Sequence, residues 1–140
     1  MKTMILMLIA AMIVSFALPQ RVLGQGVSAY SRIYDPNTVE TDSGRVVSIE
    51  HIDRGGRRSH GEHIVLRTRQ GRLMVHLGPE WFLDRQAMKI RHGDEITVTG
   101  SRVILGGKPV LIAAKVSDGR EVLVLRDSQG IPVWRGSGQR

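Results

Sequence analysis

The stretch Met74-Val-His-Leu-Gly-Pro-Glu-Trp-Phe-Leu-Asp84 decides the fold that this sequence predicts. Its first half alternates apolar and polar side chains, as a half-buried strand does. The strand should end at Gly78-Pro79, because proline interrupts a strand ladder and is well tolerated in a first helical turn. Glu80 and Asp84 then place negative charge early in a helix, where it suits the helix dipole. The stretch therefore predicts a strand that leads directly into a short helix.

Further short strands, separated by turn signals, lie on both sides of this stretch. Glycine inside a strand commonly marks a bend, and Gly44 predicts one in the first strand. Gln70-Gly71 and Gly106-Gly107 predict hairpin turns. The strands are expected at 39–52, 63–68, 73–77, 95–105, 109–116 and 121–126. This order predicts an all-β fold, a small five- to six-stranded OB-type barrel with a short helix between the third and fourth strands.

The apolar side chains divide into a barrel interior and a plug at one end. Trp81 and Phe82 in the short helix are expected to be the plug, because large aromatic side chains are usually shielded from water. The indole of Trp134, beyond the last strand, is expected to pack back on the barrel. The inward residues of the second and third strands are expected to be Ile64, Leu66, Leu73, Val75 and Leu77.

The N-terminus has the layout of a secretory signal peptide. A positive start at Met1-Lys2 precedes an apolar run from Met4 to Leu18, and Val22-Leu-Gly24 offers a cleavage site. The run is shorter than the roughly 20 apolar residues of a membrane span, so cleavage is favoured over an uncleaved anchor, which stays an alternative. We expect a periplasmic or secreted protein with no stable membrane span after cleavage. The expected segments are a signal peptide at 1–24, a flexible leader at 25–37, one OB-fold domain at 38–134 and a disordered tail at 135–140.

The expected mature chain is basic and contains no cysteine. Lys2 and Arg21 lie in the signal peptide, which leaves 18 basic residues against 13 acidic ones, a net charge of +5. Most of these basic residues are arginines, whose planar guanidinium suits phosphate and carboxylate groups. The absence of cysteine excludes disulfides, thiol catalysis and cysteine-held metal or haem centres. The domain must therefore depend on its hydrophobic core for stability.

Two segments of the chain carry a family resemblance. They are Val75-His-Leu-Gly-Pro-Glu-Trp81 and Leu125-Arg-Asp-Ser-Gln-Gly-Ile-Pro-Val-Trp134. Both resemble segments of uncharacterised exported bacterial OB-fold proteins, and more distantly the chain is similar to the bacterial OB-fold (BOF) periplasmic family. The resemblance implies the fold and the compartment. It implies no defined chemistry, although such proteins are sometimes labelled DNA-binding.

The residues expected to bind a ligand form a basic face on the first loop and the second strand. OB barrels bind ligands on the second and third strands, with help from the loop before them. Outward positions there also include His63, Met74 and His76, none of them an aromatic platform for stacking bases. Export also disfavours nucleic acid, so we expect an anionic ligand, an envelope polymer or a protein partner; single-stranded DNA binding is the alternative. The residues of this basic face are Arg54, Arg57, Arg58, Arg67 and Arg69.

Histidines near the same loop offer a second alternative, a metal-handling accessory protein. His60-Gly-Glu-His63 brings two imidazoles close in sequence, and His51 is expected across the base of the loop. Such ligands suit a divalent transition metal, although no helix holds their spacing. His76, beside the Gly78-Pro79 break, is expected to be a structural histidine that is hydrogen-bonded within the fold.

No catalytic constellation is found in the sequence. There is no Gly-x-Ser-x-Gly elbow, no His-Glu-x-x-His helix and no glycine-rich loop that opens a helix. The sequence therefore predicts a non-catalytic exported binding module without a required cofactor.

Overall fold

The computed structural model of the protein describes residues 32–53 and 60–136. The expected signal peptide, most of the leader and the last four residues of the tail lie outside these ranges. Among the described residues, no helix has both the length and the apolar character needed to cross a membrane.

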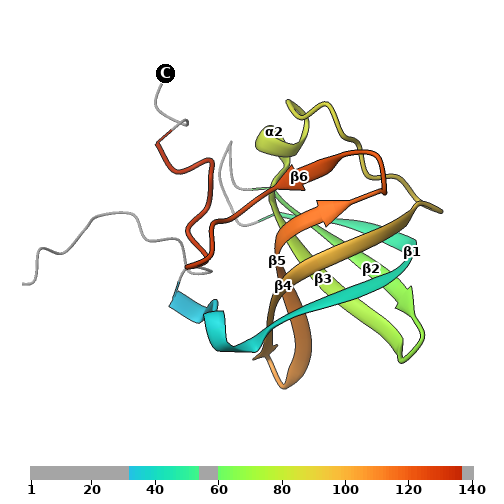
Figure 1. The fold of residues 1–140 in the computed structure, drawn as a ribbon, viewed down its shortest axis with the longest axis horizontal. Coiled ribbons are helices and arrows are strands. Elements are labelled where there is room, and N and C mark those ends of the chain that lie inside the picture. The colour runs from blue at the N-terminus through green and yellow to red at the C-terminus, as the bar shows by residue number, and fades with distance from the viewer. Residues whose placement is uncertain (1–31, 54–59, 137–140) are drawn as a thin grey trace, which may run out of the picture.

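The described residues form an all-β fold (Figure 1). The prediction of six strands, with one short helix between the third and the fourth, is confirmed for this part of the chain. A short 3-10 turn, η1, comes before the first strand. The elements are η1 (Pro36–Thr38), β1 (Val39–Ile52), β2 (Gly61–Thr68), β3 (Gly71–Pro79), α2 (Glu80–Leu83), β4 (Glu95–Leu105), β5 (Lys108–Ser117) and β6 (Val122–Val124).

The strands form one sheet that closes on itself. Their order is β3-β2-β1-β4-β5-β6, and neighbours in this order are antiparallel. β3 also pairs with β5 in parallel, from Met74 opposite Val110 to His76 opposite Ile112. This additional pairing joins the first five strands into a ring, while β6 lies on the edge beside β5.

β1 is long enough to pair with two different strands along its length. Its first half, up to Arg45, pairs with β4, and its second half, from Arg45 onward, pairs with β2. Gly44, where the sequence predicts a bend, lies at this exchange, and the register irregularity between β1 and β2 falls slightly later, between Val46 and Ser48. A Cβ added to Gly44 would stand 2.9 Å from the carbonyl carbon of Arg67 and closer still to its oxygen. Only glycine lets the end of β2 come this close to β1.

The hairpin between β2 and β3 turns one residue earlier than predicted. The turn is Arg69-Gln70, and Gly71, with φ of +121°, already belongs to β3. The Thr68 hydroxyl fixes the turn by accepting from the Gln70 amide at 3.1 Å and donating to the Gly71 carbonyl at 3.0 Å. A shift of one residue changes every cross-strand pair, so Arg67 faces Arg72.

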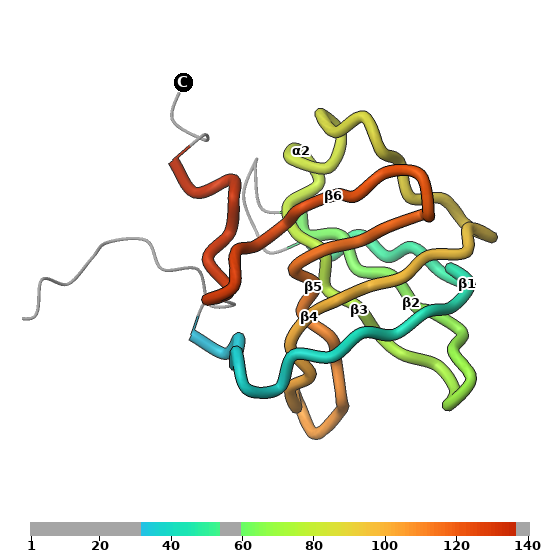
Figure 2. The backbone as a smooth tube through the Cα atoms, in the orientation of Figure 1, coloured from blue at the N-terminus to red at the C-terminus, as the bar shows by residue number. Residues whose placement is uncertain are grey.

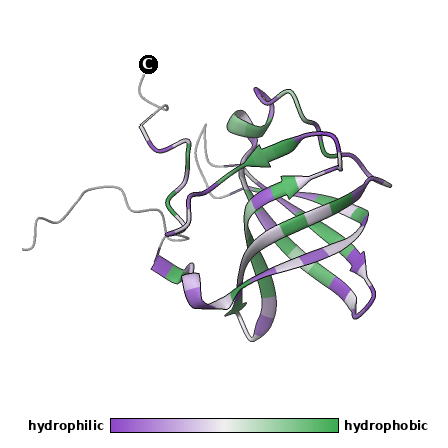
Figure 3. Cartoon of the chain, in the orientation of Figure 1, coloured by the Kyte–Doolittle hydropathy of each residue, from purple (hydrophilic) through white to green (hydrophobic). Residues whose placement is uncertain are grey.

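The interior of the ring follows the predicted alternation of apolar and polar residues, which Figure 3 shows along the strands. The five inward residues expected on β2 and β3 are all buried. The plug differs from expectation: Leu83 and Met88 are buried, Phe82 is partly buried against the core, and Trp81 is only partly buried. α2 has only four residues, and the Trp81 ring lies under the Arg85 guanidinium, 5.4 Å from the ring centroid.

The segment after β6 returns across the molecule toward the N-terminal side (Figure 2), where Gly130 touches the buried ring of Tyr34. The prediction that Trp134 packs back on the barrel is confirmed, because its indole contacts Gly78 and Phe82. Arg126 is buried, donates to the carbonyl oxygens of Leu77, at 2.9 Å, and Ala113, and lies 5.0 Å from the Trp134 ring centroid. The two segments that carry the family resemblance therefore pack on each other.

A candidate anion-binding cleft

A row of charged side chains crosses four strands at the point where β1 changes partner. Arg45 stands opposite Glu95 of β4 on one side and opposite Arg67 of β2 on the other. Arg67 in turn stands opposite Arg72 of β3. Residues directly opposite each other in a sheet share a face, so three arginines on neighbouring strands lie on one outer surface. We call Arg45, Arg67 and Arg72 the arginine row.

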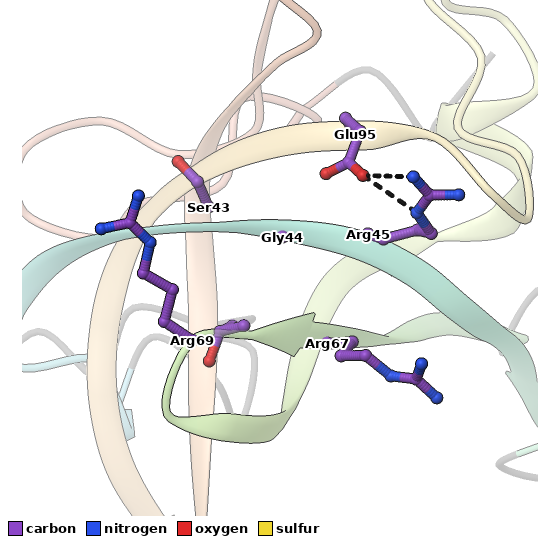
Figure 4. A pocket seen from close by; sticks show the side chains of 7 residues that line it. Ser43, Gly44, Arg45, Arg67, Arg69 and Glu95 are labelled. Atoms are coloured by element: carbon purple, nitrogen blue, oxygen red, sulfur yellow. Dashed lines mark hydrogen bonds and ion pairs between the residues drawn. The ribbon is translucent and has the colours of Figure 1, made fainter.

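An open cleft of about 580 Å³ borders this row and is lined by two of its members, Arg45 and Arg67 (Figure 4). Gly44 lies where β1 changes partner, and its lack of a side chain lets the Arg67 main chain come close to β1. In Figure 4 the Arg69 side chain extends toward Ser43, and Arg67 lies on the same side as Arg45. The lining residues are Ser43, Gly44, Arg45, Arg67, Thr68, Arg69 and Glu95.

The positive charges of the cleft are only partly neutralised. Nε and Nη2 of Arg45 each lie 2.9 Å from the same oxygen, Oε1 of Glu95. Within residues 32–53 and 60–136, Arg67, Arg69 and Arg72 have no ion pair with a carboxylate. All three are exposed. Two unneutralised guanidinium groups, those of Arg67 and Arg69, therefore line the cleft, and a third, that of Arg72, stands next to Arg67 on the same surface.

The structure places two of the five predicted ligand-binding residues, Arg67 and Arg69, in this cleft. Arg54, Arg57 and Arg58 lie outside the described residues. His60, which follows that segment, is seven residues from Arg67 along β2, about 23 Å at the rise of an extended strand. Arg45 and Arg72 were missed by the sequence analysis. The signal for Arg72 was the hairpin register, since a turn at 69–70 puts residue 72 opposite residue 67.

His63 and His76 point to the outer side of the ring, as the alternation predicts, but they are not exposed there. Both are buried, each about 7% exposed, and stand opposite each other on β2 and β3. Their rings stack with centroids 3.6 Å apart and planes 6° from parallel. Their alternation with Ile64 and Val75 places them on the outer side of the ring, yet this part of the outer side is covered. The burial and stacking agree with the structural role expected for His76 and give His63 the same role.

The other two histidines proposed as metal ligands meet around one carboxylate. Nδ1 of His51 lies 3.8 Å from Oε1 of Glu80, and Nδ1 of His60 lies 3.6 Å from Oε2 of the same side chain. Asp53 faces the other ring nitrogen of His60 at 3.6 Å. His63 is not part of this group. Among the described residues, no group of three or more histidine, aspartate or glutamate side chains is arranged to hold a metal ion.

Glu62 lies beside this histidine group, opposite His51 in the sheet. Burial raises the pKa of the Glu62 carboxyl above its usual range, because desolvation disfavours the charged form. The positive charge of His51 opposes this shift, and the negative charge of Glu80 adds to it. This end of the ring is therefore rich in carboxylates, whereas the arginine row lies at the opposite end of β2.

Comparison with known proteins assigns the chain to a family. No curated protein matches the sequence. One family model, described as the MamS/MamX magnetosome protein family, matches residues 38–123. The match begins at the last residue of η1 and ends within β6, so it includes the whole ring and the cleft. Because the match covers more than half of the chain, this protein belongs to the MamS/MamX magnetosome protein family.

Proposed function

We propose that this protein is a non-catalytic binding module that holds an anionic ligand in the cleft beside the arginine row. The observation that carries the proposal is the register that puts Arg45, Arg67 and Arg72 opposite one another on three adjacent strands. Like charges directly opposite each other destabilise a sheet. A negatively charged partner at this row would offset the repulsion between Arg67 and Arg72.

The arginines elsewhere on the ring support this interpretation by contrast. Arg102 on β4 contacts two carboxylates, Glu40 and Asp42, the second at 3.0 Å. Arg126 is buried and donates to main-chain carbonyl groups. The contacts of Arg102 and Arg126 are thus within the protein itself and account for both side chains structurally. Arg67, Arg69 and Arg72 have neither kind of contact within the described chain and are free to meet a ligand.

We further infer that the ring is of the OB type and that the chain is exported. The closed order β1-β2-β3-β5-β4 and the position of α2 between β3 and β4 support the first inference. The charged start and short apolar run of the N-terminus support the second. The family description, a magnetosome protein family, suggests the setting in which the cleft acts.

Binding of two anionic polymers, polyphosphate and polyglutamate, tests the proposal. In the double variant Arg67→Gln/Arg69→Gln we expect at least about a tenfold loss of affinity, because a hydrogen bond to a charged group contributes about 1.5–3 kcal/mol. The matched control is Lys108→Gln/Arg135→Gln, which removes the same charge. Lys108 follows the β4–β5 turn, at the opposite end of β4 from Glu95. Binding by the native chain should weaken as salt increases, since exposed charges are screened within about 8–10 Å.

Three results would contradict the proposal. The first is that neither polymer binds, and the second is that both double variants lose affinity equally, as net charge alone would predict. The third is that a single-stranded DNA of matched charge binds far more tightly than either polymer. That result would favour the nucleic-acid alternative, although no aromatic residue lines the cleft.

A further inference from the structure

The hairpin between β2 and β3 carries three unneutralised arginines within six consecutive residues, two in the cleft and one beside it. Arg67 lies at the end of β2, Arg69 in the turn and Arg72 at the start of β3. The Thr68 hydroxyl fixes this turn by its hydrogen bonds to Gln70 and Gly71. Neighbouring strands are about 4.8 Å apart, so the side chains of Arg67 and Arg72 start close together on one face. Two guanidinium groups at this separation can converge on one oxyanion.

The contact between Arg45 and Glu95 shows how a singly charged carboxylate binds on this surface. One arginine satisfies the carboxylate, with both of its contacting nitrogens 2.9 Å from one carboxylate oxygen. Arg67, Arg69 and Arg72 together offer more positive charge and more hydrogen-bond donors than a second carboxylate can use. A phosphate monoester carries a charge of about −1.5 to −2 at neutral pH and three acceptor oxygens. It matches several planar guanidinium donors better than a carboxylate does.

We infer that this surface selects a phosphate monoester, held at the edge of the cleft by Arg67 and its cross-strand neighbour Arg72, and that Glu95 sets this selectivity by occupying Arg45. Arg69 lines the cleft on its Ser43 side. This inference rests on the proposed function, because it names the ligand class of the same cleft. The volume of about 580 Å³ falls within the range of about 300–1,000 Å³ typical of small-molecule sites. There is room beside the phosphate for the esterified group, and Ser43, whose hydroxyl hydrogen-bonds Thr97 at 2.7 Å, lines the edge of the cleft.

Glu95 determines selectivity because it competes with the ligand for Arg45. A monoanion that binds between Arg45 and Arg67 must share Arg45 with this carboxylate, which already occupies Nε and Nη2. A phosphate monoester held by the hairpin arginines need not displace it. Removing the charge with Glu95→Gln should therefore improve the binding of carboxylates more than that of phosphate esters.

A matched ligand pair, glycerol phosphate and glycerate, tests the inference by calorimetry on the full chain. We expect glycerol phosphate to bind at least about ten times more tightly than glycerate at pH 7.5, given the extra charged hydrogen bonds. Arg67→Gln and Arg72→Gln should each remove most of this difference, whereas Lys108→Gln should leave it unchanged. Glu95→Gln should narrow the difference by strengthening glycerate binding. At pH 5 the ester loses one charge, because its second pKa is about 6, and its affinity should fall by about tenfold.

Vesicles distinguish a soluble ester from a lipid headgroup as the source of the phosphate. Phosphatidic acid presents a phosphate monoester, and phosphatidylserine presents a carboxylate with a phosphate diester. Binding of glycerol phosphate, or of phosphatidic acid vesicles alone, supports the inference and identifies the source.

Equal affinity within both pairs, glycerol phosphate against glycerate and phosphatidic acid against phosphatidylserine, would overturn the phosphate selectivity, while binding of the two polymers would still uphold the proposed function. If no anion binds at all, both proposals fail. Thermal unfolding of every variant by circular dichroism verifies that the exposed substitutions leave the fold intact.

Discussion

Replacing Gly44 with alanine tests the close approach of β1 and β2 that shapes the cleft. The added Cβ would lie 2.9 Å from the carbonyl carbon of Arg67 and nearer to its oxygen. Comfortable separations between carbon atoms are about 3.5–4.0 Å, so the two strands must separate by more than about 0.5 Å. Overpacking of this kind costs about 1–3 kcal/mol, and the lower entropy of the unfolded alanine chain offsets about 0.4–1 kcal/mol. The expected net loss is about 1–2 kcal/mol.

Urea and thermal unfolding measure this loss. For a domain of this size, 1 kcal/mol corresponds to about 4–8 °C, so Gly44→Ala should lower Tm by roughly 5–15 °C. The matched control is Gly61→Ala in β2, because nothing lies within 4 Å of a Cβ added there. That variant should be unchanged or slightly more stable.

Because the obstructing atoms belong to Arg67 itself, Gly44→Ala should also weaken anion binding. A Gly44→Ala variant as stable as Gly61→Ala would refute the reasoning, since the strands would then not be in contact at Gly44.

Three further perturbations test other parts of the structure. Arg126→Ala should destabilise the fold by about 3–5 kcal/mol, because it removes a buried cation that donates to two carbonyl groups and leaves a cavity. Urea unfolding measures this loss of stability, and a loss under about 1 kcal/mol would contradict the prediction. Leu83→Ala should lower the free energy of unfolding by about 2–4 kcal/mol and Trp81→Ala by roughly half as much, since only Leu83 is buried. If thermal unfolding shows the larger loss for Trp81→Ala, Trp81 closes the end of the ring after all. Glu62→Gln should stabilise the protein at pH 7, by less than about 1 kcal/mol because the group is partly exposed, and the gain should vanish as the pH falls below the usual carboxyl range.

The sign of the Glu62 effect follows from its raised pKa. A folded-state pKa above the unfolded value means that the folded protein binds the proton more tightly. The stabilisation from this proton is complete below the unfolded pKa and is lost as the pH rises through the folded pKa. At neutral pH the charged Glu62 carboxylate therefore destabilises the folded state, and the neutral glutamine side chain removes this destabilisation. A stability difference between Glu62→Gln and the native chain that is independent of pH would show that the shift is absent.

The sequence by itself determined the elements of the fold and their order. Alternation identified the inward residues of β2 and β3, because the side-chain period of a strand is a local property. Gly78-Pro79 marked the change from strand to helix, and Gly44 marked the point where β1 changes partner, because both depend on backbone chemistry at single residues. Arg67 and Arg69 could be proposed as ligand residues, since exposed arginine clusters suit anions.

Only the tertiary structure decided which residues stand side by side. Register placed Arg72 opposite Arg67 and Arg45 between Arg67 and Glu95, and a turn one residue earlier than predicted changed that register. Alternation assigned His63 and His76 to the outer face but could not show that this face is covered there. The buried role of Arg126 depends on Leu77 and Ala113, 49 and 13 residues away in the chain. Local sequence sets the face of each side chain, whereas cross-strand pairing and burial depend on segments that are distant in sequence.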